Sequence, residues 1–402
     1  MSAIFPLPEP SPLTRLSVED GLLLNAELWQ CAHQYHRQRQ NLHFQSLNQP
    51  GIVSGLGVSV IPAPENIAAK YRDGRWLEIS HGIAIDLLGN PIVVPQPIEF
   101  RLASEAKNQP LLVYITVSYV DPEKLYRQQT KYLLEETFRI DEKTSPPTEL
   151  EVELCRILIL PGTVNLTVPL NVFFPRENEI DLRYRKPAMA RCQEVVRVGL
   201  VTQNSQNDDL IISALSELLR SATALYPAME GITGINQVSL LIDRQNQPEL
   251  NYDLLYLDYQ QFLALSDAEI EVLRTYEEAG GVLLIELPTF AYQQAFINVQ
   301  QVAEKIVNIT VNTETGNIFL QHPLRKEPFL FGQFPVIQGQ EIQILNWGGI
   351  ILIVGNTSQA WTLNSGLMLP RETIRSSQEM GINILHFAYR RRQLMQLQTS
   401  RY

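Results

Sequence analysis

The fold of the first half of the chain is decided by two glycine-punctuated segments, YHRQRQNLHFQSLNQPGIVSGLGVSVIP at residues 35–62 and RWLEISHGIAIDLLGNPIVVP at residues 75–95. In the first segment, Gly51, Gly55 and Gly57 bracket alternating apolar residues, which is typical of a strand with a bulge or a close backbone approach. In the second segment, a Leu-Gly-Asn-Pro turn joins two apolar runs. Together the two segments predict a compact antiparallel β unit.

A helix is predicted ahead of this β unit, over residues 17–41. The leucines at 22–24, together with Leu28 and Trp29, supply an apolar stripe along it. We therefore expect this helix to pack on the β unit through its apolar side.

Composition and charge exclude several classes of protein. The chain has 402 residues, 45% of them hydrophobic, and a formal net charge of -11, which argues against general nucleic-acid binding. Three widely separated cysteines favour a reducing, cytoplasmic setting without disulfides. The N-terminus lacks the pattern of a secretory signal. The longest apolar runs, such as residues 111–120 and 348–355, are strand-length and well short of the roughly 18 residues that span a bilayer.

In the second half of the chain, strand patterns alternate with helix patterns. The clearest helix begins at Ser266, which forms a capping box with Glu269, and it stops at Gly280. A buried strand at 282–285 follows directly. Strand-helix-strand units of this length predict a mainly parallel sheet with helices on both faces.

The change of pattern predicts a domain boundary. Residues 176–193 are polar and charged, and we interpret them as a connector between domains. The predicted organisation is a β-rich docking module with an N-terminal helix at 1–175, the connector, and an α/β domain at 194–402.

The first half resembles the N-terminal module of accessory proteins of phage-tail-like contractile injection systems. In that family, a helix with tyrosine, histidine and arginines runs into a strand with leucine-histidine and glycine-valine motifs, and a glycine-x-alanine-isoleucine-aspartate motif follows. The chain departs from the family pattern at Phe44, where glycine is usual. The matching residues are Tyr35, His36, Arg37, Leu42, His43, Gly51, Ile52, Val53, Gly55, Leu56, Val58, Gly82, Ala84, Ile85, Asp86 and Gly89.

The second half, roughly residues 195–397, resembles a bacterial domain of unknown function whose fold is similar to class I glutamine amidotransferases. The resemblance implies a flavodoxin-like α/β domain with a mainly parallel sheet. The fold class expected for the whole chain is therefore an α+β N-terminal module, rich in β structure, followed by a flavodoxin-like α/β domain. The matching stretches are NYDLLYLDYQQFLALSDAEIEVLRTYEEAGGVLLIE (251–286), QHPLRKEPFLFGQFP (321–335), NWGGIILIVGNTSQAW (346–361) and RETIRSSQEMGINILHFAYRRRQ (371–393).

Amidotransferase chemistry needs a cysteine at a sharp strand-to-helix turn with a histidine beside it. Here the strand at 282–285 runs into Glu286-Leu287-Pro288, so we predict no catalytic residues and no enzyme. We also predict no cofactor and no metal, because Cys31 lies on a different helix face from His33 and His36 and no matching ligand pair follows at zinc-site spacing. The crevice at the strand ends remains an alternative site for a small ligand.

The candidate interface residues fall in four groups, and the histidines His36 and His43 form the first. Arg390, Arg391 and Arg392 fit either contact with a membrane or acidic partner, or a solvated helix end. The aromatic residues of PFLFGQFP fit either an interface or a core. Asp86 fits a turn or cap partner better than an acid catalyst. The full set is His36, His43, Asp86, Phe329, Phe331, Phe334, Arg390, Arg391 and Arg392.

The two resemblances together imply a non-enzymatic structural component at or near the baseplate of a contractile injection system, mediating assembly or anchoring. The expected partners are baseplate, tube or sheath proteins in a symmetric assembly of multiple copies, with a peripheral membrane contact and no nucleic acid. The expected location is cytoplasmic, with peripheral attachment to the thylakoid in the cyanobacterial type. The alternative is a ligand-binding or regulatory protein that uses the crevice of the C-terminal domain.

Overall fold

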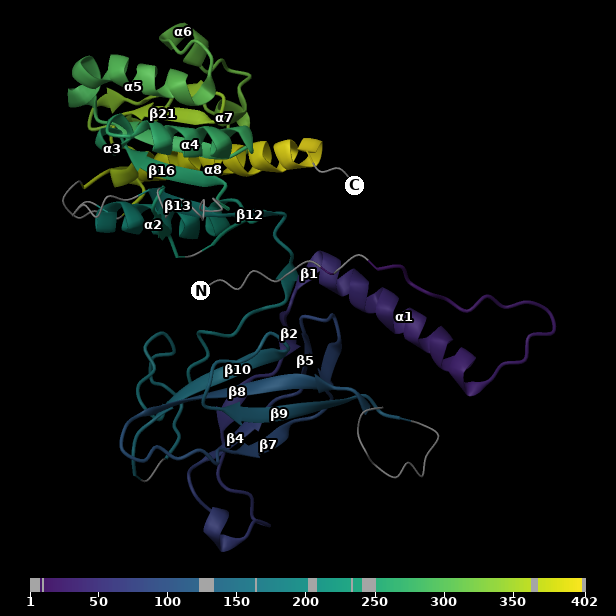
Figure 1. Ribbon diagram of the computed structural model, residues 1–402. Helices are drawn as coiled ribbons and strands as arrows, with labels where there is room; N and C mark the ends of the chain where they lie inside the picture. Colours follow the sequence, from purple (N-terminus) through teal and green to yellow (C-terminus); the bar gives the residue numbers. More distant parts are fainter. Residues whose placement is uncertain are drawn as a thin grey trace. The chain divides into compact units, whose positions relative to one another are not determined.

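The computed structural model describes residues 8, 11–122, 134–162, 165–201, 208–232, 234–240, 251–362 and 368–399. The chain divides into two compact units, and the division falls between Arg191 and Cys192. The first unit is rich in antiparallel sheets, and the second is mixed α/β (Figure 1).

The first unit is built from three three-stranded antiparallel sheets, with strand orders β2-β5-β6, β3-β4-β7 and β10-β8-β9, and from the two-stranded antiparallel sheet β1-β11. Its elements are α1 (Ala26–Leu47), β1 (Asn48–Gln49), β2 (Gly51–Gly55), β3 (Val58–Val60), the 3-10 turn η1 (Ala69–Tyr71), β4 (Trp76–Ile79), β5 (Gly82–Ile85), β6 (Pro91–Val94), β7 (Ile98–Arg101), β8 (Leu111–Val120), β9 (Thr137–Lys143), β10 (Glu151–Ile159) and β11 (Met189–Ala190).

The predicted glycine-punctuated β unit is present and contains the expected bulge. Strands β2 and β5 pair antiparallel with a register shift between Ile52 and Ser54. Gly55 follows the shift in the left-handed region, at φ +64°. A Cβ at this position would lie 2.1 Å from the carbonyl oxygen of His81, so only glycine permits the close approach of the two strands.

Residues 176–191, which we expected to form a connector, instead pack on the first unit. Ile180 is buried in its core. The Arg185 guanidinium donates hydrogen bonds to the carbonyl oxygens of Gly55, Leu56 and Leu154, and the Ala188 N–H donates to Ile52. The charged composition suggested a solvated linker, but Arg185 satisfies backbone carbonyl oxygens of the β2 end and of β10, and sequence pattern does not reveal such a contact.

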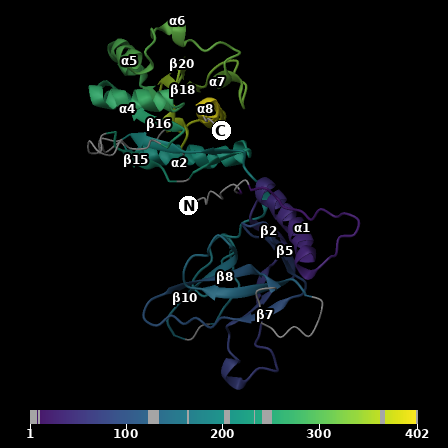
Figure 2. The same cartoon turned by 45° about the vertical axis from the view of Figure 1, so that its right-hand side comes forward.

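Helix α1 differs from its prediction in both position and packing. It begins at Ala26, because the Asn25 side chain caps the helix by accepting from the Leu28 N–H at 2.9 Å, and it runs on to Leu47. None of its residues is buried, and Trp29 is 56% exposed. The expected apolar packing on the β unit is therefore wrong. Figures 1 and 2 both show α1 running along the outside of the strands of its unit.

The C-terminal half of α1 is held by polar contacts instead. The side-chain amides of Asn41 and Asn90 hydrogen-bond at 2.8 Å, and Gln45 Nε2 donates to the Leu88 carbonyl oxygen. Gly89 lies between these two contacts at φ +77°, and a Cβ there would stand 2.5 Å from the Asn41 carbonyl oxygen. Gly89 thus allows the turn and the helix to approach.

We expect Gly89→Ala to lower the free energy of unfolding by about 1 to 3 kcal/mol and to loosen the C-terminal half of α1, because the new methyl group meets both a strained φ and the helix backbone. Hydrogen exchange of the amides at 41–47 measures the loosening. The matched control is Gly162→Ala, which has a positive φ of +106° but open space around the new Cβ. If both variants leave exchange in α1 unchanged, the close contact does not hold the helix.

The second unit is a three-layer arrangement around a six-stranded sheet. Its elements are β12 (Glu194–Val196), β13 (Val198–Val201), α2 (Asp208–Leu225), β14 (Met229–Gly231), β15 (Asn236–Val238), β16 (Leu254–Asp258), α3 (Tyr259–Leu263), α4 (Asp267–Glu278), β17 (Val282–Leu287), η3 (Thr289–Ala291), α5 (Tyr292–Val307), α6 (Thr313–Gly316), α7 (Pro323–Lys326), β18 (Val336–Ile337), β19 (Gln340–Glu341), β20 (Gln343–Trp347), β21 (Ile350–Val354), η4 (Ser358–Ala360) and α8 (Arg371–Thr399).

The strand order of this sheet is β15-β13-β16-β17-β21-β20. The first five strands are parallel to their neighbours, and β20 is antiparallel to β21. Alternate residues of each strand enter opposite cores: Leu254 and Tyr256 pack with α2 and α8, whereas Leu255 and Leu257 pack with α3, α4 and α5. Figure 2 shows α4 and α5 on one side of the strands and α8 on the other. The predicted capping box of Ser266 and Glu269 begins α4.

Candidate functional site

The carboxyl ends of the parallel strands are the first place to look for a site, because open α/β sheets bind ligands there. Glu286, at the end of β17, is 7% exposed. Its carboxylate accepts hydrogen bonds from the Tyr256 hydroxyl at 2.8 Å and from the Ser358 N–H at 2.9 Å. Asp258 caps α3 by accepting from the Gln260 N–H. Glu286 therefore ties β17 to its neighbours, and both carboxylates have structural partners.

Burial raises the pKa of Glu286 above its ordinary value, while hydrogen bonds from Ser358 and Tyr256 oppose the shift. Between the ordinary value of 4.5 and the raised folded pKa, the folded state binds more protons than the unfolded state. The free energy of unfolding should therefore fall as pH rises through this window.

We expect Glu286→Gln to remove this component of the pH dependence, because glutamine keeps the shape but does not titrate. Urea denaturation of wild type and variant from about pH 4 to about pH 7 measures it. The stability of the wild type relative to the variant should decrease with rising pH. Parallel profiles would show that burial of Glu286 does not control its ionisation.

A groove of about 710 Å³ lies beside the same strand ends. Phe290, which is 81% exposed, and Tyr292 contribute aromatic surface, and Gln293 and Gln343 contribute amides. Arg325 also lines the groove, but its guanidinium already donates to the carbonyl oxygens of Ile318, Phe331 and Gly332. The groove offers an aromatic, amide-lined surface.

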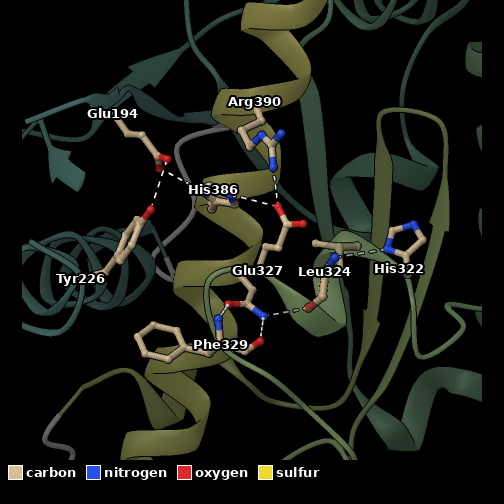
Figure 3. Close-up of polar contacts among 9 residues, drawn as sticks. Glu194, Tyr226, His322, Leu324, Glu327, Phe329, His386 and Arg390 are labelled. Carbon is tan, nitrogen blue, oxygen red and sulfur yellow. Dashed lines mark hydrogen bonds and ion pairs between the residues drawn. The ribbon is translucent and has the colours of Figure 1, made fainter. Parts of the chain in front are cut away.

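Helix α8 carries a polar cluster, drawn in Figure 3, which is buried at His386 and Glu194 and partly exposed at Glu327 and Arg390. His386 Nδ1 lies 2.8 Å from the Glu194 carboxylate, which also accepts from the Tyr226 hydroxyl at 3.5 Å. On its other side, His386 Nε2 lies 3.7 Å from the Glu327 carboxylate, and Glu327 pairs with Arg390. The cluster joins β12, α2 and the segment after α7 to the last helix.

Asn383, one turn before His386, fastens the segment that follows α7. Its Nδ2 donates to the carbonyl oxygens of Leu324 and Phe329, at 3.0 and 2.7 Å, and its Oδ1 accepts from the Phe329 N–H at 2.9 Å. His322 caps the short helix α7 by accepting from the Leu324 N–H (Figure 3). These contacts organise the backbone of the segment that follows α7.

The aromatic residues of PFLFGQFP belong to this organised segment. Phe331 is buried, and Phe329 and Phe334 are half-buried and pack against the core of the second unit. The Arg325 guanidinium lies 4.5 Å from the centre of the Phe334 ring. Of the two interpretations open from the sequence, their placement corresponds to core residues.

The three arginines of α8 are engaged within the second unit. Arg390 pairs with Glu327, and Arg392 donates to the Tyr252 carbonyl oxygen. Arg391 donates to the Glu277 carboxylate at 2.5 Å, to the Glu277 carbonyl oxygen at 2.9 Å and to the Gly281 carbonyl oxygen at 2.8 Å. Internal pairing thus accounts for the basic residues that suggested an anionic partner.

In the first unit, the candidate residues separate into buried and exposed ones. Asp86 is 5% exposed and accepts from both the N–H and the side-chain amide of Asn90, so it organises the turn that holds α1. Burial raises the pKa of Asp86, and its hydrogen bonds with Asn90 oppose the shift. His36 and His43 lie exposed on α1. Among the described residues, no group of three or more His, Cys, Asp and Glu side chains is placed to hold a metal ion.

Sequence reasoning missed an apolar loop after β10. Leu170 is fully exposed, and Phe173 and Phe174 are 70% and 73% exposed. The loop backbone is nevertheless fixed, because Asn171 Oδ1 accepts from the Phe173 N–H and Arg183 donates to the Phe173 carbonyl oxygen. The run VPLNVFFP at 168–175 was the available signal. In the described ranges, no helix combines the length and apolarity needed to cross a membrane.

Comparisons with known proteins give one family match. Residues 200–389 match the model of a Domain of unknown function (DUF4159). This match lies within residues 195–397, the range over which the sequence resembles a bacterial domain of unknown function. No curated protein matches the chain. A solved structure entitled "Crystal structure of TssK" is 12% identical, with 53% of this chain and 48% of that chain covered and a TM-score of 0.24. The chain spans about half the length of that protein, and a TM-score this low does not identify a common fold.

Proposed function

We propose that the chain is a non-enzymatic structural component of a phage-tail-like contractile injection system, at or near the baseplate, that mediates assembly or anchoring. The first unit docks on the particle, and its partners are baseplate, tube or sheath proteins. Repeated copies in a symmetric particle make weak individual contacts sufficient.

The observation that carries the proposal is helix α1, which has 22 residues and buries none of them in its own unit. Several of the residues that match the motif of the injection-system family lie on this helix, among them Tyr35, His36 and His43. In folded proteins, most of the stability of a helix comes from tertiary packing of one of its faces. A partner that covers α1 would supply that packing.

The second unit supports a role without catalysis. Strand β17 ends in Glu286-Leu287-Pro288, where amidotransferase chemistry would need a nucleophile, and Glu286 is held by Tyr256 and Ser358. We assign this unit to the flavodoxin-like, glutamine-amidotransferase-like folds, because its parallel strands follow the order 2-1-3-4-5 when numbered along the chain. Cytoplasmic location and thylakoid attachment in a cyanobacterial particle belong to the same proposal and rest on the resemblance alone.

Affinity purification of a tagged copy from native cells, separated into soluble and membrane fractions, tests the proposal. We expect sheath and tube proteins by mass spectrometry and rod-shaped particles by negative-stain imaging. The double variant Trp29→Ala, His36→Ala should keep its stability, since both side chains are exposed, and lose these partners. Lys107→Ala, on another exposed surface of the first unit, is the control. Purification of the chain alone from both fractions would refute the structural role.

The groove beside the strand ends favours a second candidate, a ligand-binding or regulatory protein. Its aromatic and amide lining suits a planar or sugar-like ring. A thermal-shift screen against nucleotides and sugars, repeated with Phe290→Ala, tests it. A shift that disappears in the variant supports binding in the groove, whereas no shift with any compound removes this candidate.

A further inference from the structure

One stripe of α1 carries an unusual set of exposed side chains. Its residues follow one another at alternating spacings of four and three, which places them along one side of a helix. All of them are exposed. We call this set the α1 stripe, and it consists of Trp29, His33, His36, Gln40, His43 and Leu47.

The α1 stripe points away from the unit that carries the helix. Gln34, Gln38, Asn41 and Gln45 lie on the opposite side of α1 and line a groove against the strands and turns of the first unit. Asn41 and Gln45 are the residues that hydrogen-bond the turn at 88–90. Because the polar side of the helix is used internally, the stripe is left as a docking surface.

The charge of the helix limits what can cover the stripe. From Leu28 to Leu47, α1 contains no aspartate or glutamate, although the chain as a whole has a net charge of -11. Arg37 turns toward Asp121 of its own unit, at 3.6 Å, whereas Arg39 is exposed and flanks His36 and His43 on the helix surface. Among the described residues, none forms an ion pair with Arg39. A partner with carboxylates could therefore form an ion pair with the Arg39 guanidinium.

A second copy of α1 does not satisfy the same requirement. A two-fold interface brings the same patch of both chains together. It would therefore bring Arg39 of one copy into the same surface as Arg39 of the other, and like charges in apposition are unfavourable.

We propose that the α1 stripe binds an acidic amphipathic helix of another protein, in a two-helix contact with Trp29 and Leu47 as apolar ends and Arg39 as the charged flank. The heptad-like spacing suits a helix rather than a strand. This inference deepens the proposed docking function and rests on it, because it specifies the chemistry of the partner.

Tryptophan fluorescence of the full chain provides a selective reading of the stripe. Trp29 is 56% exposed, whereas Trp76, Trp347 and Trp361 are 7%, 1% and 1% exposed, so acrylamide should quench Trp29 first. The probe is a peptide of about four heptads with leucine at positions a and d and glutamate at e and g. Its matched control carries lysine in place of every glutamate.

We expect the acidic peptide to protect Trp29 from acrylamide and the lysine peptide to have no effect. Protection should weaken when salt rises from about 0.1 M to about 1 M, which shortens the Debye length from about 10 Å to about 3 Å. Arg39→Gln should weaken peptide binding about two- to fivefold, as the loss of an exposed ion pair does. Lys107→Gln, which changes the net charge equally at an exposed site of the same unit, should not.

Three results would overturn the inference. Equal protection by both peptides, or by neither, would show that the stripe does not select acidic helices. Protection that grows with protein concentration without peptide would identify a second copy as the occupant. Protection by vesicles of anionic phospholipid, but by neither peptide, would identify a lipid surface. Particles that co-purify despite any of these results would leave the proposed structural role intact, so the two failures are distinguishable.

Discussion

Asn383→Ala is expected to lower the free energy of unfolding by about 3 to 5 kcal/mol, among the largest effects of a single polar substitution in this chain. The Asn383 side chain is fully buried and satisfies the Phe329 N–H and the carbonyl oxygens of Leu324 and Phe329. Alanine leaves these backbone groups without a partner, and each costs about 1 to 3 kcal/mol. Urea denaturation followed by tryptophan fluorescence measures the loss.

The matched control is Gln393→Ala, an exposed amide on the same helix α8. Its effect should stay within about 0.5 kcal/mol, because no buried group loses a partner. A cost below about 1 kcal/mol for Asn383→Ala would mean that water or local rearrangement replaces the lost hydrogen bonds, and that Asn383 does not fasten the segment after α7.

Arg391→Ala should destabilise the second unit by about 3 to 5 kcal/mol. Arg391 and Glu277 form a largely buried pair, and the Glu277 carboxylate also accepts from the Gly349 N–H at 2.8 Å. Removal of the guanidinium leaves a buried carboxylate with the hydrogen bond from the Gly349 N–H. It also removes one donor from the carbonyl oxygen of Gly281 and one from that of Glu277, which keeps the Gly280 N–H. Thermal and urea denaturation both measure the effect.

Arg390→Ala is the internal control for this prediction, since Arg390 and Glu327 are 49% and 41% exposed. It should cost less than about 1 kcal/mol. The double variant Arg391→Met, Glu277→Gln should recover part of the loss, because it removes both charges together. Equal, small effects of Arg390→Ala and Arg391→Ala would show that the Arg391 pair does not stabilise the fold and that the arginines act as a solvated helix end.

Local signals in the sequence predicted the local structure well. The capping box of Ser266 and Glu269 begins α4, and Gly280 follows its end at a φ of +93°. The bulge between Ile52 and Ser54 lies in the strand where glycines indicated it. Such features depend on neighbouring residues alone, which explains why a pattern of a few positions is sufficient.

Two predictions that depended on contacts between residues distant in the sequence were wrong. The leucines at 22–24 suggested an apolar packing face, yet Asn25 caps the helix after them, and α1 is held by Asn41 and Gln45. A polar side chain in a sequence gives no sign of whether a turn 45 or so residues away will accept its hydrogen bond. The same limit applied to Arg185, whose acceptors are carbonyl oxygens at the end of β2 and within β10, far away along the chain.

The sequence by itself determined the antiparallel β unit, the alternation of strands and helices in the second half, and the Glu286-Leu287-Pro288 ending of β17. These are matters of residue type, spacing and turn chemistry. Only the tertiary structure decided that Arg391 is enclosed, that Phe331 is core, and that the α1 stripe faces outward. Whether a side chain is buried or exposed depends on which distant surface lies against it, and that surface exists only once the chain has folded.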